Sequence, residues 1–178
     1  GGSSCISSAV AIHNQILRTR PDLLAALYEE FYIDHRGEEF EGEPPYYISP
    51  VFAIHKGHFF SRFGSKYVES AQRFPEVPRM TPTQTEGLAM FGDLAMSDEF
   101  RLDMEFERGD IQLLNNHYIV HSRTDYEDWP ELDRRRHLLR MILLTKNYAD
   151  APNFTLDLNS FIRRWGNEPR QSVLKMAN

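Results

Sequence analysis

The sequence has 178 residues, of which 41% are hydrophobic, 12% aromatic and 26% charged. This composition is typical of a globular chain and excludes an intrinsically disordered one, because it supplies enough apolar surface for a core. The 20 Lys and Arg against 26 Asp and Glu give a formal net charge of −6. Nucleic acid is therefore excluded as a partner, since phosphate binding requires a basic face. The length favours a single domain over residues 1–178.

Cysteine content and hydropathy limit the compartment. A single cysteine, Cys5, excludes an intramolecular disulfide framework and a zinc site built from cysteines. No apolar stretch approaches the roughly 18 residues that cross a bilayer, and no basic-then-apolar leader opens the chain. We therefore expect a cytoplasmic protein with no membrane partner, and no feature indicates its oligomeric state.

Three helices are predicted. The first covers residues 8–20, with Ser7 or Ser8 as its cap, and the second covers residues 22–31 after Pro21. The third begins at a capping box from Thr83 to Glu86. Apolar residues recur at helical spacing on one face of the first and third helices: Ala9, Ile12, Ile16, Leu17, Leu88, Phe91 and Leu94.

The rest of the chain favours strands. Residues 46–55 are rich in aromatic and β-branched side chains, with an edge or a bulge expected at Pro50, and residues 58–63 form a short partner strand. Further strands are predicted at residues 102–106, at 111–121 after a turn at Gly109 and Asp110, and at 136–145. Short strands grouped together, with the helices early and inserted, predict a mixed, mainly β fold: a jelly roll with helical insertions.

Two histidines are spaced as metal ligands on a helix would be. His117 and His121 are four residues apart, but Asn115 and Asn116 disfavour a helix and the residues between the histidines favour a strand. On a strand the two would lie about 13 Å apart, at ~3.3 Å per residue, so at most one could bind a given ion. The alternatives are hydrogen-bonded histidines of a sheet, or a zinc hydrolase if the segment were helical after all.

An arginine-rich segment follows. On a strand, Arg136 and Arg140 would face the same side about 13 Å apart, and their long side chains could converge on a small dicarboxylate. Pairing with the acidic residues of the preceding linker accounts for Arg134 and Arg135. It does not account for Arg140, whose apolar neighbours would make an unpaired guanidinium costly.

The order of these features resembles the taurine dioxygenase (TauD/TfdA-like) family. The similarity rests on residues 109–121, the acidic linker and residues 136–140. Residues 1–4 (Gly-Gly-Ser-Ser) are similar to the Gly-Gly-Asp-Thr segment of that family, and the strand at 50–52 and the capped third helix follow in the same order. The resemblance implies a double-stranded β-helix and an Fe(II)- and 2-oxoglutarate-dependent dioxygenase. Such an enzyme oxidises a small organic substrate with dioxygen and converts 2-oxoglutarate to succinate.

The same resemblance implies roles for individual residues. His121 would be one ligand of a two-histidine, one-carboxylate iron site. Arg136 would bind the far carboxylate of 2-oxoglutarate, and Ser4 would donate a hydrogen bond to it. Arg140 would lie nearer the iron, beside the other carboxylate of the cosubstrate or an anionic group of the substrate. Asn116 would hold the turn and the sheet.

One part of the family pattern is missing. The other two metal ligands come from a His-x-Asp/Glu motif upstream of the Gly-Gly segment, and none of the seven histidines is followed two residues later by an acid. Because the chain begins at Gly1, inside a motif and without Met, we expect the C-terminal part of a longer oxygenase, lacking its N-terminal portion and inactive alone. The alternative is a degenerate, non-catalytic jelly-roll module that binds a small anion. The oxidised substrate is not indicated.

Overall fold

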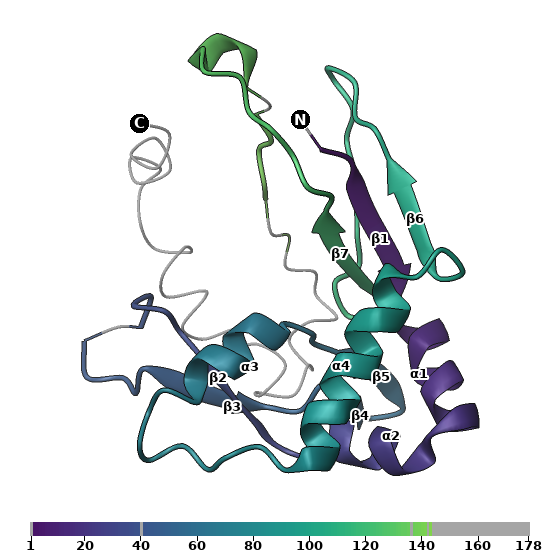
Figure 1. The fold of residues 1–178 in the computed structure, drawn as a ribbon, viewed down its shortest axis with the longest axis vertical. Helices are drawn as coiled ribbons and strands as arrows, with labels where there is room; N and C mark the ends of the chain where they lie inside the picture. The colour runs from purple at the N-terminus through teal and green to yellow at the C-terminus, as the bar shows by residue number, and fades with distance from the viewer. Residues whose placement is uncertain (1, 40, 136, 142, 144–178) are drawn as a thin grey trace.

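The computed structural model describes residues 2–39, 41–135, 137–141 and 143 (Figure 1). In chain order the strands are β1 (Ser4–Ser8), β2 (Phe31–Asp34), β3 (Tyr46–Ser49), β4 (Phe52–His55), β5 (His58–Ser61), β6 (Arg101–Met104) and β7 (Ile119–Arg123). The helices are α1 (Ala9–Thr19), α2 (Pro21–Leu27), α3 (Ser65–Ala71) and α4 (Pro82–Met96), and a 3-10 helix covers Leu132–Arg134.

The largest sheet has three antiparallel strands in the order β6-β1-β7. Its central strand, β1, was not predicted, since no element was expected between the Gly-Gly segment and the first helix at residue 8. Figure 1 shows this sheet standing above the helices, with α4 running up towards it. The first strand of the chain therefore lies between two strands that follow it by about a hundred residues.

The predicted helices are confirmed with shifted ends. The Ser8 hydroxyl accepts a hydrogen bond from the Ala11 N–H and caps α1, as predicted. In contrast, α2 ends at Leu27 rather than at residue 31, because Phe31 opens strand β2. The capping box of α4 is Thr81 with Gln84, two residues before the predicted one, so that Pro82 takes the first helical turn, where proline is tolerated.

The hydrophobic core lies below the sheet, where α1, α2 and α4 meet the two short hairpins. Phe91 of α4 is completely buried, stacks on Phe63 with ring centroids 4.0 Å apart, and lies 5.5 Å from Phe52 of β4. At Gly87, an added Cβ would come within 3.3 Å of the Leu27 side chain. The glycine therefore allows α2 and α4 to pack closely.

Two antiparallel hairpin-like pairs, β2–β3 and β4–β5, complete the lower part. The predicted strand over residues 46–55 is split at Pro50 into β3 and β4, which belong to different sheets. Lys56 and Gly57 both have positive φ, 50° and 78°, and make the tight turn between β4 and β5. Helix α3, which the sequence analysis missed, packs on β2 through buried Val68 and Ala71.

The long strand predicted over residues 111–121 is wrong in its first part. Residues 111–115 have no regular structure and 116–118 form a turn. The side chain of Asn115 accepts a hydrogen bond from the His117 N–H, and its carbonyl accepts from Tyr118 and Ile119, so the chain turns before β7 begins. The strand predicted over residues 136–145 is also wrong for its described residues, 137–141 and 143, which form neither helix nor strand.

The fold class is thus a mixture of helices and antiparallel sheets, as predicted at that level. In the part that the structure describes, no helix combines the length and the apolar character that crossing a membrane requires.

Candidate functional site

The register of the three-stranded sheet places two predicted site residues on one face. Ile6 of β1 lies directly opposite His121 of β7, and Ser4 lies opposite Arg123. Because side chains alternate along a strand, Ser4, Ile6, His121 and Arg123 all point to the same side. We call this side the His121 face. Diagonal neighbours such as Ser4 and His121 are about 7–8 Å apart, within the reach of a five-carbon diacid.

The opposite face is covered by α4. The Ser7 hydroxyl donates to the carbonyl of Ala95 at 2.6 Å, and the Ser122 hydroxyl approaches the sulfur of Met96 at 3.7 Å. Cys5 on this side is 2% exposed, and burial raises the pKa of its thiol. Among the described residues, the contacts of α4 with this sheet therefore lie on the side opposite the His121 face.

Ser4 is held in place by the strand start and by one side-chain contact. Gly2 has a positive φ of 84°, and a Cβ there would meet the Cβ of Tyr126 at 3.0 Å, so only glycine fits the approach to β1. The Ser4 hydroxyl donates to Oε1 of Gln112 at 3.4 Å and is 7% exposed. Gln112 was missed by the sequence analysis, although a glutamine stands out in the otherwise apolar run 111–114.

The imidazole of His121 is solvent-exposed, yet its pKa is lowered, first by partial desolvation and then by the positive charge of Arg140. Both effects favour the neutral ring, which is the form that binds metals. The charge of Arg140 thus reaches His121. The expectation that Arg140 is buried among apolar neighbours is wrong, since Arg140 and its described neighbours Leu138, Leu139 and Met141 are exposed.

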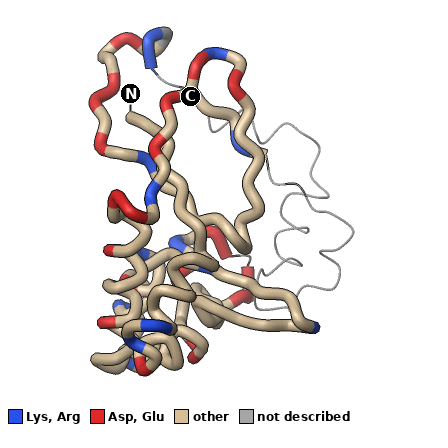
Figure 2. The backbone as a smooth tube through the Cα atoms, turned by 90° about the vertical axis from the view of Figure 1, so that its right-hand side faces the viewer, with Lys and Arg blue, Asp and Glu red and all other residues tan. Residues whose placement is uncertain are grey.

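Arg136, the residue predicted to bind the far carboxylate of 2-oxoglutarate, lies outside the described residues. Two basic groups nevertheless act at the His121 face: Arg123, whose guanidinium lies 3.2 Å from the centroid of the Tyr126 ring, and Arg140, whose charge lowers the pKa of His121. Figure 2 shows that the loops beyond the sheet carry both acidic and basic residues. The His121 face therefore has positively charged side chains near it, although the chain as a whole has a net charge of −6.

His117 does not share a strand with His121. It is buried in the turn before β7, its ring makes an edge contact with Phe60 at 4.8 Å, and burial and the charge of Arg62 lower its pKa. Since residues 119–123 form a sheet strand, the helical pair needed by the zinc-hydrolase alternative does not exist. Asn116 lies in the same turn.

The described residues do not by themselves fit an iron centre. A two-histidine, one-carboxylate site needs three ligands, and no group of three His, Cys, Asp or Glu side chains comes together in residues 2–39, 41–135, 137–141 and 143. His121 could supply one ligand, and the other two would have to come from elsewhere.

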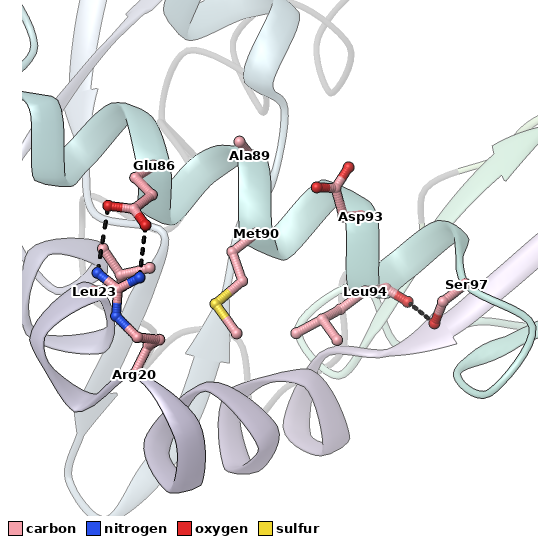
Figure 3. A pocket seen from close by; sticks show the side chains of 8 residues that line it. All are labelled: Arg20, Leu23, Glu86, Ala89, Met90, Asp93, Leu94 and Ser97. Atoms are coloured by element: carbon pink, nitrogen blue, oxygen red, sulfur yellow. Dashed lines mark hydrogen bonds and ion pairs between the residues drawn. The ribbon is translucent and has the colours of Figure 1, made fainter.

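A hollow of about 450 Å³ lies between the end of α1, α2 and α4 (Figure 3). Its lining includes Leu23, Met90 and Leu94, and the Arg20 guanidinium spans one end to reach Glu86 at 2.6 Å. None of the predicted site residues lines it. The hollow therefore belongs to the helical side and adds nothing to the His121 face.

Comparison with known proteins identifies the family. The family model described as "Taurine catabolism dioxygenase TauD, TfdA family" matches residues 1–142. The chain belongs to the TauD/TfdA family. This match covers β1 with Ser4, β7 with His121, and the segment that contains Arg136 and Arg140, and it confirms the resemblance seen in the sequence.

Two curated relatives agree with this assignment. FR-33289 synthase of Streptomyces rubellomurinus is 33% identical over 174 residues, which cover 93% of this chain and 48% of that protein. A taurine hydroxylase-like protein of Stachybotrys chartarum is 28% identical over 187 aligned positions, covering 98% of this chain and 47% of that protein. One relative is named as a synthase and the other as a hydroxylase-like protein, and the chain spans about half the length of either.

Proposed function

We propose that this TauD/TfdA chain carries the 2-oxoglutarate-binding half of an Fe(II)-dependent dioxygenase that oxidises a small organic molecule. His121 supplies one iron ligand, and Arg136 and Ser4 bind the far carboxylate of 2-oxoglutarate. Arg140 holds the near carboxylate of the cosubstrate or an anionic group of the substrate. When bound, iron would supply the oxidising chemistry, with 2-oxoglutarate and dioxygen as cosubstrates and succinate and carbon dioxide as products.

The observation that carries this proposal is the shared face of Ser4 and His121. In the antiparallel register, Ser4 pairs with Arg123 and His121 pairs with Ile6, so Ser4 and His121 are diagonal neighbours on one face. The charge of Arg140 also lowers the pKa of His121. A neutral imidazole, a hydroxyl donor and a guanidinium are the groups that a metal-chelating dicarboxylate requires. The double-stranded β-helix expected for the family would enclose this face.

The remaining two iron ligands are proposed to come from residues outside this chain. The sequence has no His-x-Asp/Glu motif, and the relatives that it matches are about twice its aligned length. On this face His121 and Leu102 are exposed among the described residues, so a further segment could approach it.

The experiment that tests the proposal measures succinate formed from 2-oxoglutarate by the full-length gene product with Fe(II). Arg136→Leu should weaken 2-oxoglutarate binding by more than about a hundredfold, because a bidentate ion pair is lost. Arg135→Leu is the matched control: its guanidinium donates to the carbonyls of Trp129 and Pro130, 2.9 and 3.1 Å away, and should not affect the affinity. Equal affinity of the Arg136 variant and the wild type would refute the assignment.

A second candidate function is a non-catalytic module that binds a small anion through Arg136 and Arg140. The absence of a three-ligand cluster in the described part of the chain favours it. Titration of residues 1–178 with 2-oxoglutarate, with and without Fe(II), separates the two. Binding that is independent of metal supports the module, whereas binding that needs Fe(II) and the full-length product supports the dioxygenase.

A further inference from the structure

Gln112 occupies an unexpected position beside the His121 face. In the irregular segment before β7, Ile111 and Leu113 are 85% and 79% exposed, whereas the glutamine between them is half-buried against the sheet. An amphipathic segment normally turns its apolar side chains inward. Here the polar residue faces inward and the apolar residues face out.

The Gln112 carboxamide lies across the β1–β6 pair. Its Oε1 accepts from the Ser4 hydroxyl at 3.4 Å, and its Nε2 contacts the sulfur of Met104 at 3.8 Å. Ser4 and Met104 are directly opposite each other, so one amide covers both. The first bond is at the long limit for a hydroxyl donor, and a thioether is a weak acceptor. Both donors, the Ser4 hydroxyl and Nε2 of Gln112, can therefore change to a stronger acceptor at little cost.

We propose that Gln112 is a further 2-oxoglutarate-binding residue, whose Nε2–H donates to the same carboxylate that Ser4 binds. The inference rests on the proposed function and deepens it. When the carboxylate enters, the Ser4 hydroxyl turns from Oε1 of Gln112 to the anion, and the amide offers its donors beside it. A carboxylate has several lone pairs, so it accepts from Ser4, Gln112 and a guanidinium together.

The test uses two substitutions in the full-length gene product. Gln112→Leu removes the amide. Gln112→Glu keeps an oxygen that accepts from Ser4 and therefore keeps the local packing, but it places a negative charge beside the incoming carboxylate. The control is Gln15→Leu, a glutamine on α1 whose side chain bonds Arg18 and lies away from the sheet face.

Affinity is measured by calorimetry with Fe(II), for 2-oxoglutarate and for 2-oxobutyrate. The second compound has the same 2-oxo acid group but lacks the second carboxylate. Gln112→Leu should weaken 2-oxoglutarate binding about tenfold or more, as expected for a lost hydrogen bond to a charged group, and Gln112→Glu should weaken it further. Neither variant should change the affinity for 2-oxobutyrate, and Gln15→Leu should change neither.

Equal losses for both ligands would show a merely structural role and overturn the inference, as would no loss for either ligand. If the wild type binds 2-oxoglutarate and Arg136→Leu weakens it while both Gln112 variants bind normally, the inference about Gln112 fails alone. If the wild type itself fails to bind 2-oxoglutarate, the proposed function fails and the inference falls with it.

Discussion

The two sides of the three-stranded sheet differ in what they contact. On one side Cys5 is 2% exposed and Ser7 is bonded to α4, whose other side reaches the core through Phe91. On the His121 face, Leu102 is 57% exposed although it pairs with the same central strand. The difference is that one side of β1 packs into the fold, whereas the other side is the one on which we propose that the ligand binds. Substitutions on the packed side should therefore change stability, and those on the His121 face should change affinity.

The largest effect on the packed side is expected for Phe91→Ala. The ring is completely buried between Phe52 and Phe63, so its removal leaves a cavity and should lower the free energy of unfolding by about 3–5 kcal/mol. Urea denaturation measures the change. Leu102→Ala on the His121 face should cost less than about 1 kcal/mol, and a comparable loss at the two positions would break the comparison.

Asp34→Asn should be the next largest. The carboxylate is buried, accepts from the Ser70 hydroxyl and from the Arg36 N–H at 2.8 Å, and pairs with Arg73 at 3.2 Å. Burial raises its pKa, but these hydrogen bonds and charges outweigh burial and leave the pKa lowered. Losing the charge should cost about 2 kcal/mol at pH 7.

The pH dependence of this effect has a definite sign. A carboxyl with a lowered folded pKa stabilises the fold above its unfolded pKa of about 3.9, and the contribution is lost as the pH falls through the folded value. The stability difference between wild type and Asp34→Asn should thus be full at pH 7 and shrink below about pH 4. A difference that grows on acidification would contradict the assignment.

A matched pair on β1 sharpens the comparison with the smallest effects. Ser7→Ala loses the 2.6 Å bond to Ala95 and should lower the free energy of unfolding by about 1 kcal/mol without changing 2-oxoglutarate affinity. Ser4→Ala loses only a 3.4 Å contact and should cost about 0.5 kcal/mol or less, but should weaken 2-oxoglutarate about tenfold. Thermal unfolding of both variants measures the loss of stability, which should be larger for Ser7→Ala. Calorimetry measures the loss of 2-oxoglutarate affinity, which should be larger for Ser4→Ala.

The sequence predicted the elements whose signals are local. Ser8 caps α1 as expected, and residues 58–61 pair with the preceding strand as expected. The start of α4 was misplaced because two capping boxes overlap there, and Pro82 selects the earlier one. Phe31, the first residue of strand β2, was taken as the end of a helix because it continues the apolar spacing of α2.

What the sequence did not predict depends on long-range pairing. Nothing local marks residues 4–8 as the middle strand of a sheet, since that position is set by β6 and β7, about a hundred residues away. Only the family resemblance assigned Ser4 and His121 to one site, and the register that sets them on the same face comes from the pairing of β1 with β7. Gln112 escaped notice because its importance lies in the contact with Ser4, which no spacing rule predicts.

The central claim is that the His121 face binds the metal. Anaerobic calorimetry of the full-length gene product with Fe(II) tests it most directly, comparing His121→Ala with His58→Ala, an exposed histidine on β5. Losing a direct ligand should cost more than the tenfold to hundredfold typical of outer-shell groups, so His121→Ala should weaken Fe(II) binding by more than about a hundredfold while His58→Ala binds as the wild type does. A folded His121→Ala protein with wild-type Fe(II) affinity would contradict the account.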